Sequence, residues 1–306
     1  MLPHSLSRPS RLLLSSLLWL SAATSALASE ESAVRFEVER QGRTSLIHAN
    51  NRAPGTMSVR VRLLGDNIRS NRSWPQTVVL GPGERLLLGE VQAREPGAAH
   101  DFRVSLSAQL GRLNARTASN QRYRLPYADG EAYAISQAAS GPLTSHQDPL
   151  MREAVDFTMP EGTPVHAARE GVVVRVVMHF ETGGLDPALL EQANEIVLEH
   201  PDGTLGVYAH LAPNSARVRP GDQVQTGQRL ASSGNTGFSS GPHLHFALMR
   251  PRLIGEQFRL EALPVRFATG QPARTLVPVV GLRASAADQG PARVEYLPVA
   301  TTQGAR

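Results

Sequence analysis

The stretch Glu-Ile-Val-Leu-Glu-His-Pro-Asp-Gly-Thr-Leu-Gly-Val-Tyr-Ala-His, residues 195–210, decides the fold class of this chain. It contains two apolar segments, residues 195–200 and 204–210, separated by Pro201-Asp202-Gly203. This tripeptide favours a tight turn, so the stretch predicts two strands joined as a hairpin. Residues 171–177 before it and 244–248 after it have the apolar pattern of buried strands. The region is therefore predicted to be all-β.

The residues upstream of this region alternate between apolar and polar side chains, as half-buried strands do. Turn signals such as Pro54-Gly55 separate the alternating segments. We predict an N-terminal β-sandwich over residues 29–125 and a second β-domain over residues 130–270. A partly irregular tail over residues 271–306 should be loose, or lie along the surface, from about Gly281 onward. Within the second domain, Asp186 and Pro187 predict the start of one short helix over residues 186–194.

The first 28 residues have the pattern of a secretory signal peptide. Arg8 and Arg11 precede a short apolar run at residues 12–20, and Ala26-Leu27-Ala28 forms a cleavage site. A membrane anchor is the alternative, but the run is shorter than the roughly 20 apolar residues that a spanning helix needs. We therefore expect export to the periplasm or cell envelope, with no stable membrane insertion after cleavage.

Charge and cysteine content exclude several classes of function. The net charge is +4, and removal of Arg8 and Arg11 with the signal, which has no acidic residue, leaves 4 − 2 = +2. Every basic side chain is arginine, and no basic run indicates nucleic-acid binding. The chain has no cysteine, so a cysteine peptidase and a thiolate zinc site are excluded. Any metal site must use His, Asp or Glu side chains.

The segment Gly-Pro-His-Leu-His-Phe at residues 241–246 indicates a metal site. His243 and His245 are two residues apart, so on a strand they point to the same face. A catalytic zinc takes three protein ligands and keeps a fourth position for water. Asp156 is the best candidate carboxylate and His146 a candidate third ligand, while His210 could join the same cluster.

Three competing signals carry less weight. Residues 237–241 match the Gly-x-Ser-x-Gly pattern of serine hydrolases, but that motif needs a strand before it and a helix after it. A glycosidase needs a pair of carboxylates, and no carboxylates here have that setting. His166, His179 and His200 are interpreted as internally bonded or surface residues rather than ligands, and Tyr208 as either a core residue or a contributor to the site.

Five motif blocks in order resemble the lysostaphin-like (LytM-type) zinc metallopeptidases, which cut peptide cross-links of peptidoglycan. The resemblance covers about residues 130–250, and its blocks are Asp156-Phe157, residues 160–165, residues 208–211, Gly221-Asp222 and residues 233–246. It implies a lysostaphin-like (duplicated hybrid motif) β-domain after the sandwich. It further implies that Asp156 and His245 bind Zn²⁺ and that His210 and His243 are catalytic.

One position departs from the family's common pattern, which puts the remaining zinc-binding histidine four residues before the aspartate. Arg152 occupies that place, and an arginine stays protonated and cannot bind zinc. We predict that His146 supplies the ligand from a longer loop, because the ten residues to Asp156 can span up to ~35 Å. The alternative is a degenerate site.

The sequence therefore predicts a zinc endopeptidase acting on peptidoglycan peptide. The alternative is a non-catalytic domain that binds peptidoglycan or activates a cell-wall amidase. Because the proposed ligands all lie beyond residue 140, we expect the sandwich to be dispensable for hydrolysis of small peptides.

Overall fold

The computed structural model describes residues 33–139, 148–268, 275–285 and 295–296. The regular secondary structure of this part of the chain is almost entirely β-strand, which confirms the predicted all-β class. None of the helical segments in the described ranges is long and apolar enough to span a membrane.

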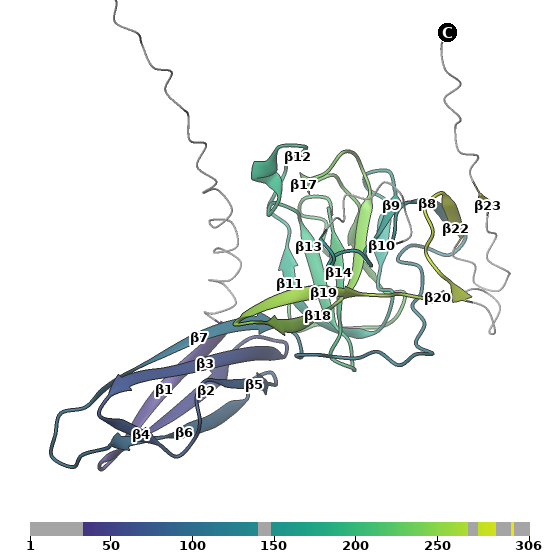
Figure 1. Ribbon diagram of the computed structural model, residues 1–306. Helices are drawn as coiled ribbons and strands as arrows, with labels where there is room; N and C mark the ends of the chain where they lie inside the picture. Colours follow the sequence, from purple (N-terminus) through teal and green to yellow (C-terminus); the bar gives the residue numbers. More distant parts are fainter. Residues whose placement is uncertain (1–32, 140–147, 269–274, 286–294, 297–306) are drawn as a thin grey trace, which may run out of the picture.

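The first seven strands form two antiparallel sheets, called here the N-terminal sheets (Figure 1). One has the order β1-β2-β6-β4 and the other β5-β3-β7. The strands are β1 (Val34–Gln41), β2 (Thr44–Asn51), β3 (Met57–Asp66), β4 (Ile68–Ser70), β5 (Gln76–Leu80), β6 (Arg85–Ala93) and β7 (Asp101–Leu110). The alternation at Met57, Val59 and Val61 reflects burial of these side chains. The sandwich and its bounds, residues 29–125, stay a prediction.

The second half of the chain builds one large sheet, the main sheet, with the order β15-β11-β13-β14-β18-β9-β8-β22-β23 and β19 paired to β18. Its strands are β8 (Ala132–Gln137), β9 (Val155–Thr158), β11 (Gly171–Val177), β13 (Glu195–Glu199), β14 (Leu205–Ala209), β15 (Gln223–Val224), β18 (Leu244–Ile254), β19 (Gln257–Leu263), β22 (Leu282–Ser285) and β23 (Glu295–Tyr296). Three small pairs flank it: β10 (Pro164–His166) with β16 (Arg229–Ser232), β12 (Gly183–Gly184) with β17 (Gly237–Phe238), and β20 (Phe267–Ala268) with β21 (Thr275–Leu276).

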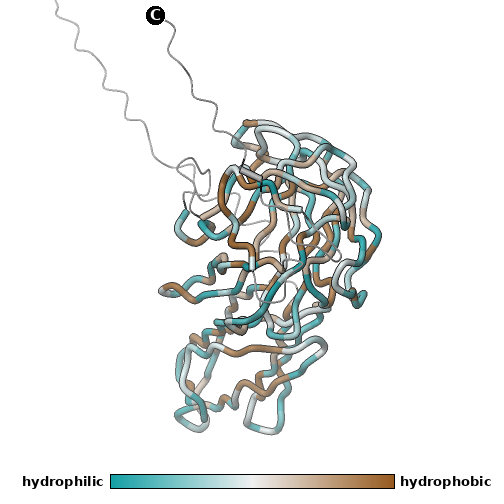
Figure 2. Tube along the Cα trace, turned by 90° about the vertical axis from the view of Figure 1, so that its right-hand side faces the viewer, coloured by the Kyte–Doolittle hydropathy of each residue, from teal (hydrophilic) through white to brown (hydrophobic). Residues whose placement is uncertain are grey.

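The two faces of the main sheet are buried in different cores. Side chains such as Ile196, Tyr208 and Phe246 pack in a core that belongs to the second half of the chain alone. Their neighbours along the strands, such as Val197 and Val207, pack in a cluster with the N-terminal sheets. Figure 2 shows hydrophobic segments running through both parts of the molecule. The alternation of a strand thus sends successive side chains into two cores.

The second cluster, called here the junction core, joins the two halves of the chain. The main sheet contributes Ala154, Val174, Val197, Leu205, Val207, Ala247 and Met249, and the N-terminal sheets contribute residues such as Val59, Ala108 and Leu110. At its border the Thr56 N–H donates to the Glu199 carboxylate (2.7 Å). The turn between β18 and β19 reaches the N-terminal sheets (Figure 1). There the Glu256 carboxylate pairs with Arg60 (2.6 Å) and Arg62. The N-terminal sheets therefore cover the part of this face where the junction core lies.

Two segments differ from the sequence-based expectation. Instead of a helix over residues 186–194 there is one 3-10 turn, η1 (Pro187–Leu189), whose Ala188 N–H donates to the Asp186 carboxylate (2.9 Å). None of its residues is buried, so no apolar face stabilises a longer helix. In the tail, β22 pairs with β8, and Leu282 and Ala284 are buried. Residues 282–285 are therefore a strand of the main sheet and not loose.

Candidate functional site

Asp156 and His245 face each other across two adjacent strands. β9 and β18 are antiparallel, and their register places Asp156 directly opposite His245. The His245 Nδ1 atom lies 2.8 Å from the Asp156 Oδ1 atom. Asp156 is only 2% exposed. A carboxylate buried this deeply needs a hydrogen-bonded or cationic partner, so this pair is a place where a cation would be stabilised.

His243 lies on the same side of this pair, just before β18 begins. Its Nε2 atom is 3.9 Å from the Asp156 Oδ2 atom. Its Nδ1 atom is 2.8 Å from the Gly241 carbonyl oxygen. Because a carbonyl only accepts, the Nδ1 atom of His243 donates this hydrogen bond, and its Nε2 atom faces Asp156.

His210 completes the cluster from the end of β14. Its ring centroid is 4.5 Å from that of His243 and 5.9 Å from that of His245. The Nδ1–H of His210 donates to the Thr236 carbonyl oxygen (2.7 Å), so this ring keeps an unprotonated Nε2 atom. Burial, together with the neighbouring imidazoles of His243 and His245, lowers the pKa of His210 to about 4. His210 is therefore neutral at pH 7.

The backbone at His210 is unusual, because its φ angle is 60°. Few residues other than glycine adopt this left-handed region, although asparagine, aspartate and histidine do so more often than the rest, and the conformation persists where the surroundings hold it. This conformation ends β14 and turns the ring of His210 toward His243 and His245.

The donor set of this cluster fits zinc, which binds imidazole nitrogens and carboxylate oxygens. Of the predicted ligands, Asp156 and His245 lie together, while His146 lies outside the described residues. Within the described ranges, no group of three His, Cys, Asp or Glu side chains is arranged to hold a metal ion. Arg152, four residues before Asp156, is exposed. The third ligand thus stays a prediction.

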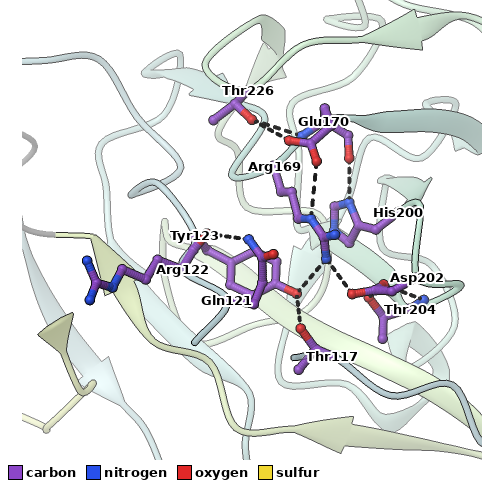
Figure 3. Close-up of polar contacts among 10 residues, drawn as sticks. All are labelled: Thr117, Gln121, Arg122, Tyr123, Arg169, Glu170, His200, Asp202, Thr204 and Thr226. Carbon is purple, nitrogen blue, oxygen red and sulfur yellow. Dashed lines mark hydrogen bonds and ion pairs between the residues drawn. The ribbon is translucent and has the colours of Figure 1, made fainter. Parts of the chain in front are cut away.

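The remaining histidines of the second half lie away from the cluster. His179 is exposed and its ring lies beside that of Phe180, while His166 is half-buried. His200 is buried, and its Nδ1–H donates to the Glu170 carbonyl oxygen (2.8 Å). It belongs to the polar network in Figure 3, in which Arg169 binds Asp202 and contacts Tyr123. This network ties the chain segment around Tyr123 to the main sheet.

His200 predicts a pH dependence of stability. Burial lowers its pKa in the folded protein to about 4, whereas an unfolded histidine titrates near about 6.5. Between these values the unfolded chain binds a proton that the folded chain does not, so the free energy of unfolding falls as the pH falls. We expect a loss of up to about 3 kcal/mol from pH 7 to pH 4. Urea unfolding at several pH values measures it, and equal pH slopes for the wild type and His200→Gln would contradict it.

Several polar residues around the cluster were not predicted. The Thr236 carbonyl oxygen accepts the hydrogen bond from the His210 Nδ1–H, and the Ser239 hydroxyl lies 3.2 Å from the His243 Nδ1 atom. Asn235 directly precedes Thr236, and its buried Oδ1 atom has no hydrogen-bond partner within the described residues. The available signal was the turn-rich stretch at residues 232–237, which indicates a loop but not its contacts.

Comparison with known proteins gives relatives that match part of the chain. The peptidoglycan DD-endopeptidase ShyA of Vibrio cholerae is 37% identical over 108 residues, covering 35% of this chain and 22% of that protein. The glycyl-glycine endopeptidase ALE-1 of Staphylococcus capitis is 41% identical over 96 residues, covering 31% of this chain and 24% of that protein. The DD-carboxypeptidase/endopeptidase Mpg of Neisseria meningitidis is 30% identical over 155 residues, covering 50% of this chain and 31% of that protein. The chain thus spans less than a third of the length of these curated relatives.

The fold and the His/Asp cluster together define the class of lysostaphin-like peptidase domains. Residues 150–257 match the model of peptidase family M23. The chain therefore contains a region, residues 150–257, that resembles the peptidases of family M23. The matched range includes four of the predicted site residues, Asp156, His210, His243 and His245, and begins after His146, which it does not include.

Proposed function

We propose that this protein is a zinc-dependent endopeptidase that hydrolyses peptide cross-links of peptidoglycan. The observation that carries the proposal is the cross-strand pair of Asp156 and His245, with two further imidazoles packed beside it. A binding module has no chemical need for three histidines and a buried carboxylate in one cluster. A metal-assisted hydrolase needs both the ligands and the bases.

Asp156, His245 and His146 would hold the zinc ion. When bound in such a site, zinc acidifies a water molecule and polarises the scissile carbonyl group. The protein's own contribution starts with the strand register, because β9 and β18 bring two of the ligands together without any loop. Ligands on paired strands need little reorganisation, so their geometry is preset.

His210 and His243 would move protons. Each ring donates its Nδ1–H to a backbone carbonyl, at Thr236 and Gly241 respectively, which fixes both the orientation and the tautomer. The free Nε2 atom can then accept a proton from the attacking water and pass it to the leaving amine. Burial keeps His210 neutral, as a proton acceptor must be at pH 7.

The names of the relatives support the substrate class. ShyA is a peptidoglycan DD-endopeptidase and Mpg a DD-carboxypeptidase/endopeptidase, and both are similar to part of this chain. Peptidoglycan lies outside the cytoplasmic membrane, which agrees with the signal peptide expected at residues 1–28. We therefore place the protein in the periplasm or cell envelope.

The proposal is tested with the full mature chain. Its zinc content is measured by elemental analysis, and the protein is incubated with purified peptidoglycan whose new amino groups and muropeptides are quantified. We expect one zinc per chain and cleaved cross-links, with activity lost on chelation and restored by added zinc. A folded chain that binds no metal and releases no new amino groups would contradict the proposed enzyme function.

The alternative, a non-catalytic domain that binds peptidoglycan or activates an amidase, is favoured by Arg152, which stands where the family commonly has a ligand. His146→Ala separates the two. Strand β8 ends at Gln137, which is paired with Asp156, and His146 follows nine residues later in the sequence. We expect His146→Ala to lose both zinc and hydrolysis, whereas full zinc content and activity in this variant would disprove its role.

A further inference from the structure

Asn194 is a fully buried polar residue next to the catalytic cluster, and all of its polar groups are used. Its Nδ2 atom donates to the carbonyl oxygens of Phe180 (2.7 Å) and Leu211 (3.2 Å), and its Oδ1 atom accepts from the Phe180 N–H (2.9 Å). Its exposed fraction is 0%. A side chain amide with this many buried partners is costly to replace, because each lost bond leaves a partner unsatisfied.

The bonds of Asn194 converge on the residue that follows His210. The Leu211 N–H donates to the Asn194 carbonyl oxygen (3.1 Å), and the Leu211 carbonyl oxygen accepts from the Asn194 side chain. Both backbone groups of Leu211 are thereby fixed. This matters because His210 has a left-handed φ of 60°, a conformation that the surrounding bonds must hold in place.

A second route runs through Thr236. The Asn194 N–H donates to the Thr236 hydroxyl oxygen (3.0 Å), and that hydroxyl donates to the Leu211 carbonyl oxygen (2.9 Å). The carbonyl oxygen of the same Thr236 accepts the Nδ1–H of His210 (2.7 Å). Asn194 therefore fixes the backbone after His210. It also holds Thr236, whose carbonyl oxygen accepts the hydrogen bond from the His210 ring.

We propose that Asn194 is a positioning residue that holds His210 in its left-handed conformation and, through Thr236, keeps the ring proton on Nδ1. Its catalytic consequence rests on the proposed peptidase function, but the conformation and the tautomer do not. Asn194 touches no reacting group itself. It acts by keeping the His210 Nδ1–H on the Thr236 carbonyl oxygen and the ring directed toward His243 and His245.

A purely structural role is the competing explanation, because Asn194 also closes the base of the segment 180–194. Asp186→Ala is the matched control, since the Asp186 carboxylate caps η1 in the same segment and contacts neither His210 nor Leu211. Three variants test the role itself. Asn194→Ala removes the whole amide, Asn194→Asp keeps the shape and removes both Nδ2 donors, and Thr236→Val removes only the hydroxyl.

The experiment uses the full mature chain and combines kinetics with long-range ¹H–¹⁵N correlation spectra of the histidine rings. We expect each test variant to keep its zinc content and its KM on a cross-linked peptide, and to lose about 10–100-fold in kcat. In the same variants the His210 ring should change from a single Nδ1–H tautomer to a mixture. Asp186→Ala should show neither change.

The inference is overturned if the folded variants retain a pure Nδ1–H tautomer at His210, whatever their kcat. It is equally overturned if Asp186→Ala lowers kcat and mixes the tautomer as much as Asn194→Ala does. Should Asn194→Ala fail to fold, Asn194→Asp and Thr236→Val decide the question. A wild type without hydrolytic activity would end the peptidase proposal, while the ring spectra would still decide the role of Asn194.

Discussion

His245→Ala is expected to remove zinc from the protein and to reduce hydrolysis of peptidoglycan peptide by more than about 100-fold. Loss of an outer-shell partner alone costs roughly 10–100-fold in metal affinity or activity, so loss of a ligand should exceed that range. The structural reason is that His245 is the residue opposite Asp156 in the strand register. Its removal takes away one of the two predicted ligands that the described structure brings together. Because His245 is part of a paired strand, a neighbouring residue cannot move into its place without breaking the strand register.

His179→Ala is the matched control, because His179 is an exposed histidine of the same domain whose ring contacts Phe180 rather than the cluster. Elemental analysis and a muropeptide assay are run on both variants, with circular dichroism to verify folding. We expect the control to keep its zinc and its activity. Zinc retention in folded His245→Ala at the wild-type level would show that the metal, if present, is bound elsewhere.

The parts of the fold that depend on neighbouring residues were predictable from the sequence. The hairpin at residues 195–210 is observed as β13 and β14, paired in register from Glu195 with Ala209 to Glu199 with Leu205. Apolar alternation and a Pro-Asp-Gly turn depend only on residues close in sequence. They therefore predict a hairpin whichever part of the protein buries its strands. The same holds for the position of His245 on a strand beside His243.

Contacts between distant segments were not predictable in this way. The alternation of β14 shows that Val207 is buried, but not that the N-terminal sheets bury it. Asn194 is a single asparagine before a strand, and nothing local distinguishes it from a solvent-exposed one. The left-handed backbone of His210 likewise follows from bonds made by Leu211 and Thr236 with residues far along the chain. Such features need the folded structure, because their partners are chosen by packing.

Deletion of residues 29–125 is expected to leave the rest of the chain insoluble or unfolded, although all the predicted ligands lie beyond residue 140. The deletion uncovers one face of the main sheet, where Val174, Val197, Leu205, Val207 and Met249 pack in the junction core. Each such side chain stabilises the fold by roughly 2 kcal/mol when buried, so their joint exposure costs on the order of 10 kcal/mol. A domain is typically stable by only about 5–15 kcal/mol, so the loss is of the size of the whole stability.

The sequence alone predicted that the sandwich is dispensable for hydrolysis of small peptides, and the structure argues against this. His245, Ala247 and Met249 lie on the same face of β18. Ala247 and Met249 are in the junction core, so the N-terminal sheets cover the face that carries the catalytic cluster further along.

Soluble yield and thermal unfolding are measured for the truncated chain and for a truncated chain carrying Val174→Thr, Val197→Thr and Val207→Thr. Threonine keeps the shape of valine and tolerates water, so the triple variant should recover solubility. The prediction is wrong if the truncated wild-type sequence melts cooperatively within a few degrees of the full chain, because the N-terminal sheets would then be dispensable for stability. Hydrolysis of a small peptide by that truncated protein would show that they are also dispensable for activity.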